Sequence, residues 1–185
     1  MKISTKQMVI GGVLLALMIA SQFLKNLSVY ITGPIVNLIL IIATLSVGLF
    51  MGIILSIIAP ITSFLITGAP IMAAIPLIIP AVMAGNIIIC IAAWFFYNKL
   101  SFKGRLPVGL VVGSVCKALF MGAVIVKCLL PLFSSKLPEA KRDIMGAAAS
   151  TTFSVTQLIT ALIGSALACV IWALAGKQLK RDAAE

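Results

Sequence analysis

Long apolar stretches, separated by short polar or turn-forming connections, dominate the sequence. A membrane-spanning helix needs about 20 mostly apolar residues. Strong turn signals occur at Gly33-Pro34 and at Thr67-Gly68-Ala69-Pro70, and an uncharged turn is expected at Ser46-Val47-Gly48. The pattern predicts six membrane spans, at about residues 7–23, 35–47, 50–66, 75–96, 107–132 and 147–174.

The composition excludes a soluble globular domain. Of the 185 residues, 62% are hydrophobic and only 10% are charged, whereas soluble domains have roughly 45–50% apolar and about 25% charged residues. Six spans use roughly 120 residues, and no remaining polar stretch is long enough to fold alone. We therefore predict a single transmembrane domain over residues 1–185, an all-α membrane protein with a six-helix bundle.

The distribution of lysines and arginines predicts the direction of the spans. An even number of spans puts both termini on one side of the membrane, and cytoplasmic loops are enriched in Lys and Arg. With cytoplasmic termini, the inner side carries eight such residues and the outer side four. The inner set is Lys2, Lys6, Lys99, Lys103, Arg105, Lys177, Lys180 and Arg181, and the outer set is Lys25, Lys136, Lys141 and Arg142. We predict a multi-pass protein of a bacterial-type plasma membrane, with both termini cytoplasmic and with Trp94 and Trp172 in the inner aromatic belt.

Two prolines, Pro76 and Pro80, occupy the outer half of the fourth predicted span. Proline removes a backbone donor and kinks a helix. Broken helical geometry is tolerated in a membrane only where other groups satisfy the freed carbonyls, often beside a cavity. The prolines therefore indicate a kink, and a candidate cavity, near the outer end of this span.

The chemistry available inside the spans excludes most enzymes. The chain has no histidine, and its four acidic residues lie in predicted loops or tails. Metal-dependent hydrolysis and general acid–base catalysis need such groups, so we predict no enzymatic activity, no metal site and no cofactor. Proton-coupled transport usually needs a buried carboxylate or histidine, and a Walker phosphate loop is absent. Uphill transport would therefore need energy from another chain.

Two lysines, Lys117 and Lys127, lie within the fifth predicted span. An ionisable residue at membrane depth is a functional hypothesis by default. On an α-helix the two would lie about 15 Å apart along the axis and about 80° apart around it, so both can face the bundle interior. Each is a candidate contact for an anionic ligand. The alternative is that Lys127 extends to the outer headgroups and Lys117 bonds to backbone carbonyls.

Uncharged polar side chains add further candidate contacts. Ser154 and Gln157 belong to a polar face in the outer half of the sixth span, and Asn86 follows the two prolines of the fourth. Such groups also form hydrogen bonds between helices, and Asn37 in the second span has the same two interpretations. The candidate substrate-binding residues are Asn86, Lys117, Lys127, Ser154 and Gln157.

The first span carries a stripe of small residues at four-residue spacing, formed by Gly12, Ala16 and Ala20. Small residues let another helix approach closely, so the stripe is a candidate surface for docking a partner. The alternative is that the stripe packs against neighbouring helices of the same chain.

The spacing of Ala16 and Ala20, together with Thr32-Gly33-Pro34 before two apolar helices, resembles the substrate-binding S components of energy-coupling factor (ECF) vitamin transporters. The resemblance covers almost the whole chain. It implies a pocket near the outer face, formed by the last three helices and closed by loops one, three and five, which implicates Asn86, Lys127 and Gln157 by position. It also implies that the alanine stripe docks on a membrane coupling subunit that is bound to two ATPases, which would supply the missing energy.

The predicted function is therefore the capture of a small anionic vitamin or related micronutrient, followed by ATP-driven delivery to the cytoplasm. The alternative is a stand-alone anion channel or facilitator, with Lys117 and Lys127 lining the path. A third reading is a membrane scaffold without a ligand. The net charge of +10 is not read as nucleic-acid binding, because the charges flank spans that are embedded in the lipid bilayer.

Overall fold

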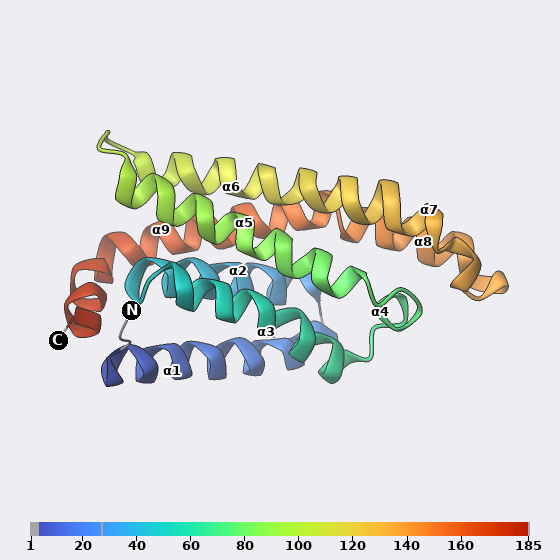
Figure 1. The fold of residues 1–185 in the computed structure, drawn as a ribbon, viewed down its shortest axis with the longest axis horizontal. Helices are drawn as coiled ribbons and strands as arrows, with labels where there is room; N and C mark the ends of the chain where they lie inside the picture. The colour runs from blue at the N-terminus through green and yellow to red at the C-terminus, as the bar shows by residue number, and fades with distance from the viewer. Residues whose placement is uncertain (1–3, 27, 185) are drawn as a thin grey trace.

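The computed structural model describes residues 4–26 and 28–184, and these form a bundle of helices that run along one long axis (Figure 1). Six helical segments are long and apolar enough to cross a membrane, which confirms the predicted all-α membrane bundle. They are α1 (Thr5–Gln22), α2 (Val29–Ser46), α3 (Leu49–Thr67), α5 (Ile78–Lys99), the α6–α7 segment (Arg105–Leu132) and the α8–α9 segment (Arg142–Leu179).

Short helical turns connect these segments. They are η1 (Phe23–Asn26), α4 (Pro70–Ala74), η3 (Ser134–Lys136) and η4 (Glu139–Lys141). Lys2, one of the residues used to predict orientation, lies outside the described residues, and so do the side chains of Lys25, Lys141, Lys180 and Arg181.

The second span begins earlier than the sequence predicted. Ser28 caps α2 by accepting a hydrogen bond from Tyr30 N at 3.1 Å, and Gly33 and Pro34 lie inside the helix instead of in a turn. Pro34 removes the N–H that would bond to the Tyr30 carbonyl, near the start of the helix. Farther along, Asn37 Nδ2 donates to the Gly33 carbonyl at 2.8 Å. The next boundary is as predicted, because α2 and α3 meet at Gly48, whose φ of 128° favours glycine.

Two helix pairs organise the bundle: α5 packs along α6, and α2 packs along α9 (Figure 1). Helix α2 is central, with Leu40 and Ile41 fully buried, whereas α1 lies on the flank against α2 and α3. Both described ends of the chain lie at one end of the bundle (Figure 1), as an even number of spans requires. We call this end the terminal end. The opposite end holds α4 and α8 (Figure 1), and we call it the cavity end.

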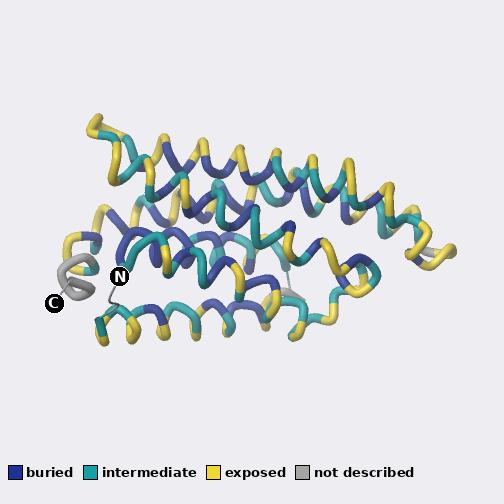
Figure 2. Tube along the Cα trace, in the orientation of Figure 1, coloured by how far each residue is buried: buried dark blue, intermediate teal, exposed yellow. Residues whose placement is uncertain are grey.

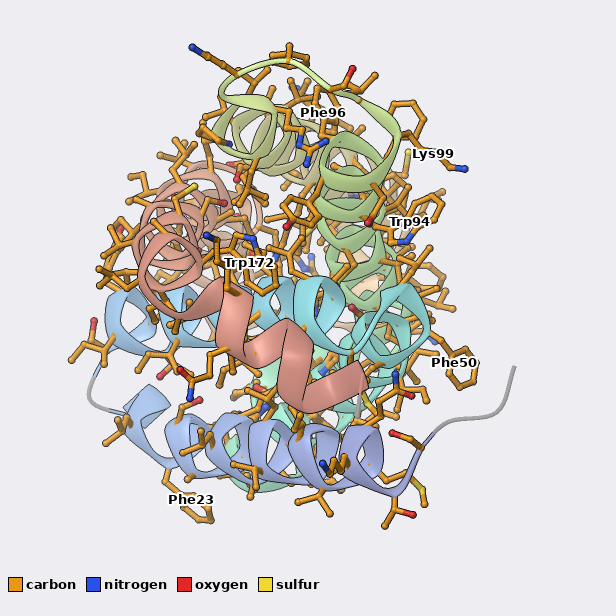
Figure 3. The ribbon with its side chains drawn as sticks, turned by 90° about the vertical axis from the view of Figure 1, so that its left-hand side faces the viewer. Phe23, Phe50, Trp94, Phe96, Lys99 and Trp172 are labelled. Carbon is orange, nitrogen blue, oxygen red and sulfur yellow. The ribbon has the colours of Figure 1, made fainter. Side chains whose placement is uncertain are left out.

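The terminal end is closed by a cluster of aromatic and cationic side chains. The rings of Tyr97 and Trp172 meet edge to face at 5.5 Å between centroids, and the Arg105 guanidinium lies 5.0 Å from the centre of the Tyr97 ring. A Cβ at Gly176 would lie 2.8 Å from the Trp172 ring, so glycine permits this close approach. Trp172 is therefore only 8% exposed and lies inside the bundle (Figure 3), not in a lipid-facing aromatic belt as predicted.

Helix irregularities concentrate toward the cavity end. The chain breaks between α4 and α5 at residues 75–77, where Pro76 lies, and a π-helical segment, η2 (Gly122–Leu129), interrupts the fifth span before α7 (Leu130–Leu132). The sixth span is not one helix, because α8 (Arg142–Thr152) ends before Phe153 and α9 (Val155–Ala184) begins after Ser154. The kink predicted in the fourth span is thus a complete break of the helix. The break in the sixth span was not predicted.

Candidate functional site

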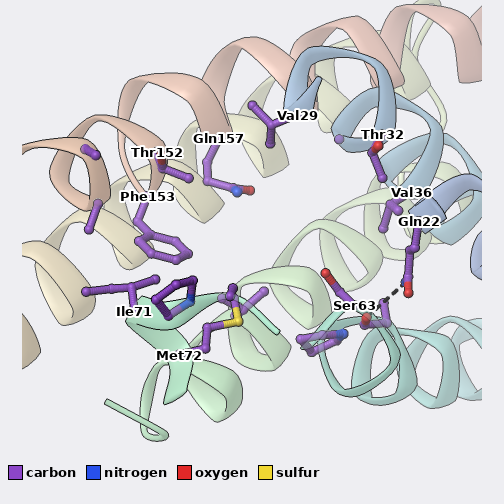
Figure 4. A pocket seen from close by; sticks show the side chains of 18 of the residues that line it. Gln22, Val29, Thr32, Val36, Ser63, Ile71, Met72, Thr152, Phe153 and Gln157 are labelled. Carbon is purple, nitrogen blue, oxygen red and sulfur yellow. Dashed lines mark hydrogen bonds between the residues drawn. The ribbon is translucent and has the colours of Figure 1, made fainter. Parts of the chain in front are cut away.

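A cavity of about 650 Å³ occupies the cavity end, and all six spans contribute to its wall. This volume lies within the range of roughly 300–1,000 Å³ that is typical of small-molecule sites. Figure 4 shows the wall from close by: Phe153 and Gln157 lie on one side, Gln22 and Ser63 on the other, and Met72 of α4 below them. The breaks around α4 and before α9 thus place side chains around a space that uninterrupted helices would not leave.

A buried lysine, Lys117 on α6, belongs to the cavity wall. Its side chain is only 2% exposed, and its Nζ donates to Asn37 Oδ1 at 2.6 Å and to Asn86 Oδ1 at 2.8 Å. The two asparagines belong to α2 and α5, so three spans meet at one cation. No Asp or Glu is among the described residues that line the cavity. Among the described residues, the groups that bond to this buried ammonium are therefore the side-chain amide oxygens of Asn37 and Asn86.

Two further residues of the cavity wall have amide side chains. Gln22, the last residue of α1, is 1% exposed, and its Nε2 donates to the Ala59 carbonyl at 3.0 Å. Gln157 of α9 lies on the opposite side and is half-buried, and its side chain bonds to no other described residue (Figure 4). Lys136 adds a second positive charge at the exposed rim. The polar groups are few and the rest of the wall is mainly apolar, a composition typical of binding sites for organic molecules.

Three of the five predicted substrate-binding residues line the cavity: Asn86, Lys117 and Gln157. Lys127 does not, because its side chain is exposed on the outer surface of η2. The angle of about 80° between the two lysines assumed an α-helix, and the wider turns of a π-helix change that angle. The headgroup-facing alternative fits Lys127, whereas Lys117 bonds to amide side chains and not to backbone carbonyls.

Ser154 also lies away from the cavity. Its Oγ donates to the Ser150 carbonyl at 2.5 Å, and it faces a separate small hollow between α6 and α9 that is lined by apolar side chains such as Val115 and Leu158. The break at residues 153–154 turns this part of the predicted polar face toward α6. The serine hydroxyl therefore bonds within its own span, to the carbonyl four residues earlier, and not to the cavity.

The first three spans contribute residues that the sequence prediction did not include. The predicted pocket used the last three helices, but Gln22, Thr32 and Asn37 also line the cavity. A signal was present for Asn37, a polar residue within an apolar span, and Thr32 belongs to the stretch used for the resemblance. Gln22 followed the apolar core of the first span and looked like the start of a loop, so its burial depends on the neighbouring helices.

The small-residue stripe of α1 lies on the outside of the bundle. Gly12, Ala16 and Ala20 are exposed, and a Cβ placed on Gly12 would meet nothing within 4 Å. Figure 2 shows exposed positions along the edge of α1 that faces away from the other helices. The inward face instead uses Gly11 and Met18. The alternative in which the stripe packs against helices of the same chain is therefore wrong.

The fold and the cavity together define a class of protein: a multi-pass membrane bundle that encloses a site of solute size near one end. The family model for the substrate-specific component of ECF transporters matches residues 6–174. No curated protein and no solved structure matches the chain. Because the family match spans most of the chain, this protein belongs to the ECF transporter substrate-specific components. It is an integral membrane protein and the substrate-binding subunit of an ECF transporter. This role is a transport role and not an enzymatic one, and it implies a substrate and an energising module with ATPases.

Proposed function

We propose that this protein binds a small anionic solute, of the size and kind of a vitamin or related micronutrient, in the cavity lined by Lys117. The observation that carries the proposal is the buried Lys117 ammonium, which has amide oxygens but no carboxylate beside it within the described cavity wall. Removing a cation from water is costly unless an opposite charge or strong hydrogen bonds compensate. An anionic ligand would supply the missing charge.

The geometry of the ammonium group supports ligand contact. Nζ of a lysine has three donors, and two of them are used by Asn37 and Asn86. Because Lys117 also lines the cavity, the third donor is available for an acceptor on a ligand. The asparagines act as positioning residues: each fixes the lysine from a different helix and holds Nζ in place before a ligand arrives.

The direction of transport follows from the predicted orientation. If both termini are cytoplasmic, as the lysine and arginine distribution predicts, the cavity end faces the outside. The solute would then enter the cavity from the outer face and leave toward the cytoplasm after the energising module acts. The exposed stripe of Gly12, Ala16 and Ala20 is the proposed docking surface for the membrane coupling subunit of that module, since small side chains allow close helix contact.

Native mass spectrometry of the detergent-purified protein tests the proposed site. We expect the wild type to retain one small anionic molecule, either from the cell or after soaking in a vitamin mixture. The Lys117→Met variant should lose at least about 100-fold in affinity, because a buried charge-assisted contact is removed. Lys127→Met is the matched control: this lysine lies on the same span but is exposed, so binding should not change. An empty wild type after soaking, or equal loss in both variants, would contradict the proposal.

Uptake into proteoliposomes tests the docking surface and the channel alternative together. With an ECF energising module and ATP, Ala16→Trp should abolish uptake and leave solute binding unchanged, because the bulky ring keeps the coupling subunit away from the stripe. Val111→Trp on α6, at a position that is also exposed, is the control and should transport normally. Uptake that proceeds without the module or ATP would favour a stand-alone facilitator, and loss of binding in Ala16→Trp would contradict a docking role.

A further inference from the structure

Asn37 and Asn86 both support the Lys117 ammonium, but their NH2 groups differ. An ammonium only donates hydrogen bonds, so the oxygen of each amide faces Nζ and the orientation of both amides is fixed. The NH2 group of Asn37 then donates to the Gly33 carbonyl at 2.8 Å. The NH2 group of Asn86 bonds to no other described residue. One of the two supporting amides therefore has an unused donor.

The unused donor of Asn86 lies on the cavity wall beside the lysine. Asn86 is 4% exposed and lines the cavity, and its Nδ2 is not among the described atoms that are fully buried without a partner. The NH2 group therefore keeps accessible surface. Oδ1 and Nδ2 are attached to the same carbon, so Nδ2 lies close to the Nζ that Oδ1 binds, and Nζ of Lys117 has a third donor of its own. One anionic group can accept hydrogen bonds from both.

The charge at this pair of donors is a single positive one. Lys117 is the one basic residue that the described parts of the membrane spans contribute to the wall, and Lys136 lies in η3 at the exposed rim. A carboxylic acid carries one negative charge at neutral pH, whereas a phosphate monoester carries about 1.5 to 2. A buried charge without a counter-charge is costly. The lysine therefore matches a carboxylate better than a phosphate.

A ligand that also carries a cation has no counter-charge at this position. The amide oxygens beside Lys117 are bonded to its Nζ, and the described cavity wall contains no Asp or Glu. In an amino acid, the ammonium is attached to the carbon next to the carboxylate, so it would lie close to Nζ. Like charges at short distance repel, and most strongly away from water. The site therefore disfavours zwitterions.

We infer that the substrate is a monocarboxylic acid with an otherwise uncharged body, and that its carboxylate accepts hydrogen bonds from both Lys117 Nζ and Asn86 Nδ2. This inference rests on the proposed function and narrows it to one headgroup. Asn86 is then a ligand contact that determines specificity, whereas Asn37 only positions the lysine. Apolar side chains of the wall, such as Val82 and Phe153, suit an organic body.

Native mass spectrometry with matched probes tests the headgroup on the full-length protein in detergent. One series is phenylpropionate, phenylpropionamide, phenylalanine and phenylethyl phosphate, and a second series carries the same four headgroups on an indole ring. In the better-retained series, the acid should exceed the phosphate and the amino acid by at least about tenfold. The amide should not be retained, because it has no charge for the lysine.

NMR of the side-chain amides tests whether Asn86 contacts the carboxylate. The chain has four asparagines, so protein labelled isotopically at asparagine nitrogen gives four NH2 signals. Asn26→Gln, Asn98→Gln and either Asn37→Gln or Asn86→Gln assign them. The retained acid should shift the Asn86 NH2 protons downfield and slow their exchange with water, because they gain a charged acceptor. The Asn37 signal should move much less, since that group already bonds to a carbonyl.

Asn86→Leu and Asn37→Leu are a matched pair of variants. Each removes one amide oxygen from Lys117, but only Asn86→Leu removes the unused donor. Asn37→Leu also loses the bond to Gly33, so the comparison is conservative. Affinity for the retained acid should be about tenfold lower in Asn86→Leu than in Asn37→Leu.

The outcomes separate the inference from the proposed function. Retention of a phosphate ester, a dicarboxylate or an amino acid in preference to the monocarboxylate overturns the inference but leaves the lysine site standing. An Asn86 NH2 signal that stays in place when a retained acid saturates the protein also overturns it, and so does equal affinity in the two Leu variants. If no probe and no vitamin is retained, the proposed function fails, and the inference with it.

Discussion

The same membrane spans form both ends of the bundle, but they pack closely at one end and leave a cavity at the other. At the terminal end, α5, α6 and α9 run without interruption and bring Tyr97, Arg105 and Trp172 into direct contact. At the cavity end, the same three spans are broken or widened at residues 75–77, 122–129 and 153–154, and polar groups such as Lys117 and Gln22 are buried next to open space.

The difference shows where backbone regularity is given up. Uninterrupted helices satisfy their own backbone groups and pack closely, which suits an end that stays closed. Breaks and π-helical turns forgo some of that regularity, and they occur frequently at functional sites. The terminal end therefore stabilises the bundle through close helix packing, and the cavity end is the part suited to binding a solute. Each prediction below tests one side of that division.

The largest expected effect is on stability at the terminal end. Trp172→Ala removes a buried ring that fills the space between α5 and α9 and should lower the free energy of unfolding by about 3 kcal/mol, while the affinity for a retained solute stays within about twofold. Thermal unfolding followed beside ligand binding measures both. Trp94→Ala is the control, because Trp94 lies at the same end but is only partly buried, and it should lose much less stability. A Trp172→Ala protein that folds well but binds poorly would break the comparison.

The next effect is on affinity at the cavity end. Asn86→Asp places a carboxylate of the same shape beside Lys117, so the lysine gains an internal counter-ion and an anionic ligand is repelled. Affinity for the retained anion should fall by about 30-fold, or about 2 kcal/mol, and the midpoint of thermal unfolding should not fall. Asn98→Asp, at an exposed position of the terminal end, should change neither quantity. Unchanged anion affinity in Asn86→Asp would remove Lys117 from the binding site.

The smallest effect concerns the rim. Lys136 is exposed beside the cavity, with its Nζ 5.2 Å from the centre of the Phe133 ring. Rim charges mainly change association rates, and salt screens them. Lys136→Gln should slow association of an anionic solute by about twofold at low ionic strength and have no effect at high salt, as measured by stopped-flow binding. A large change in the dissociation rate would instead make Lys136 part of the buried site.

Much of the fold could be predicted from the pattern of apolar residues. The length of an apolar stretch is a local property that must match the thickness of the bilayer core. The six spans and the turn at Gly48 were therefore predictable. The start of α2 was not, because Pro34 is a turn signal locally, whereas the Ser28 cap and the packing of α2 against α9 stabilise a helix there. The division of the sixth span was missed for the opposite reason: the helix breaks at residues 153–154, where the sequence has no proline or glycine.

The sequence by itself determined the class of this protein and the scarcity of charge in its interior. It also marked Lys117 as a candidate, because an ionisable residue at membrane depth is rare whatever surrounds it. Only the tertiary structure decided that Lys117 faces the cavity and Lys127 does not, since η2 changes the rotation of the helix between them. It also decided that Gln22 is buried with a free acceptor. The physical reason is that apolar length and residue type are local quantities, whereas the direction of a side chain depends on how each helix is turned and broken against its neighbours.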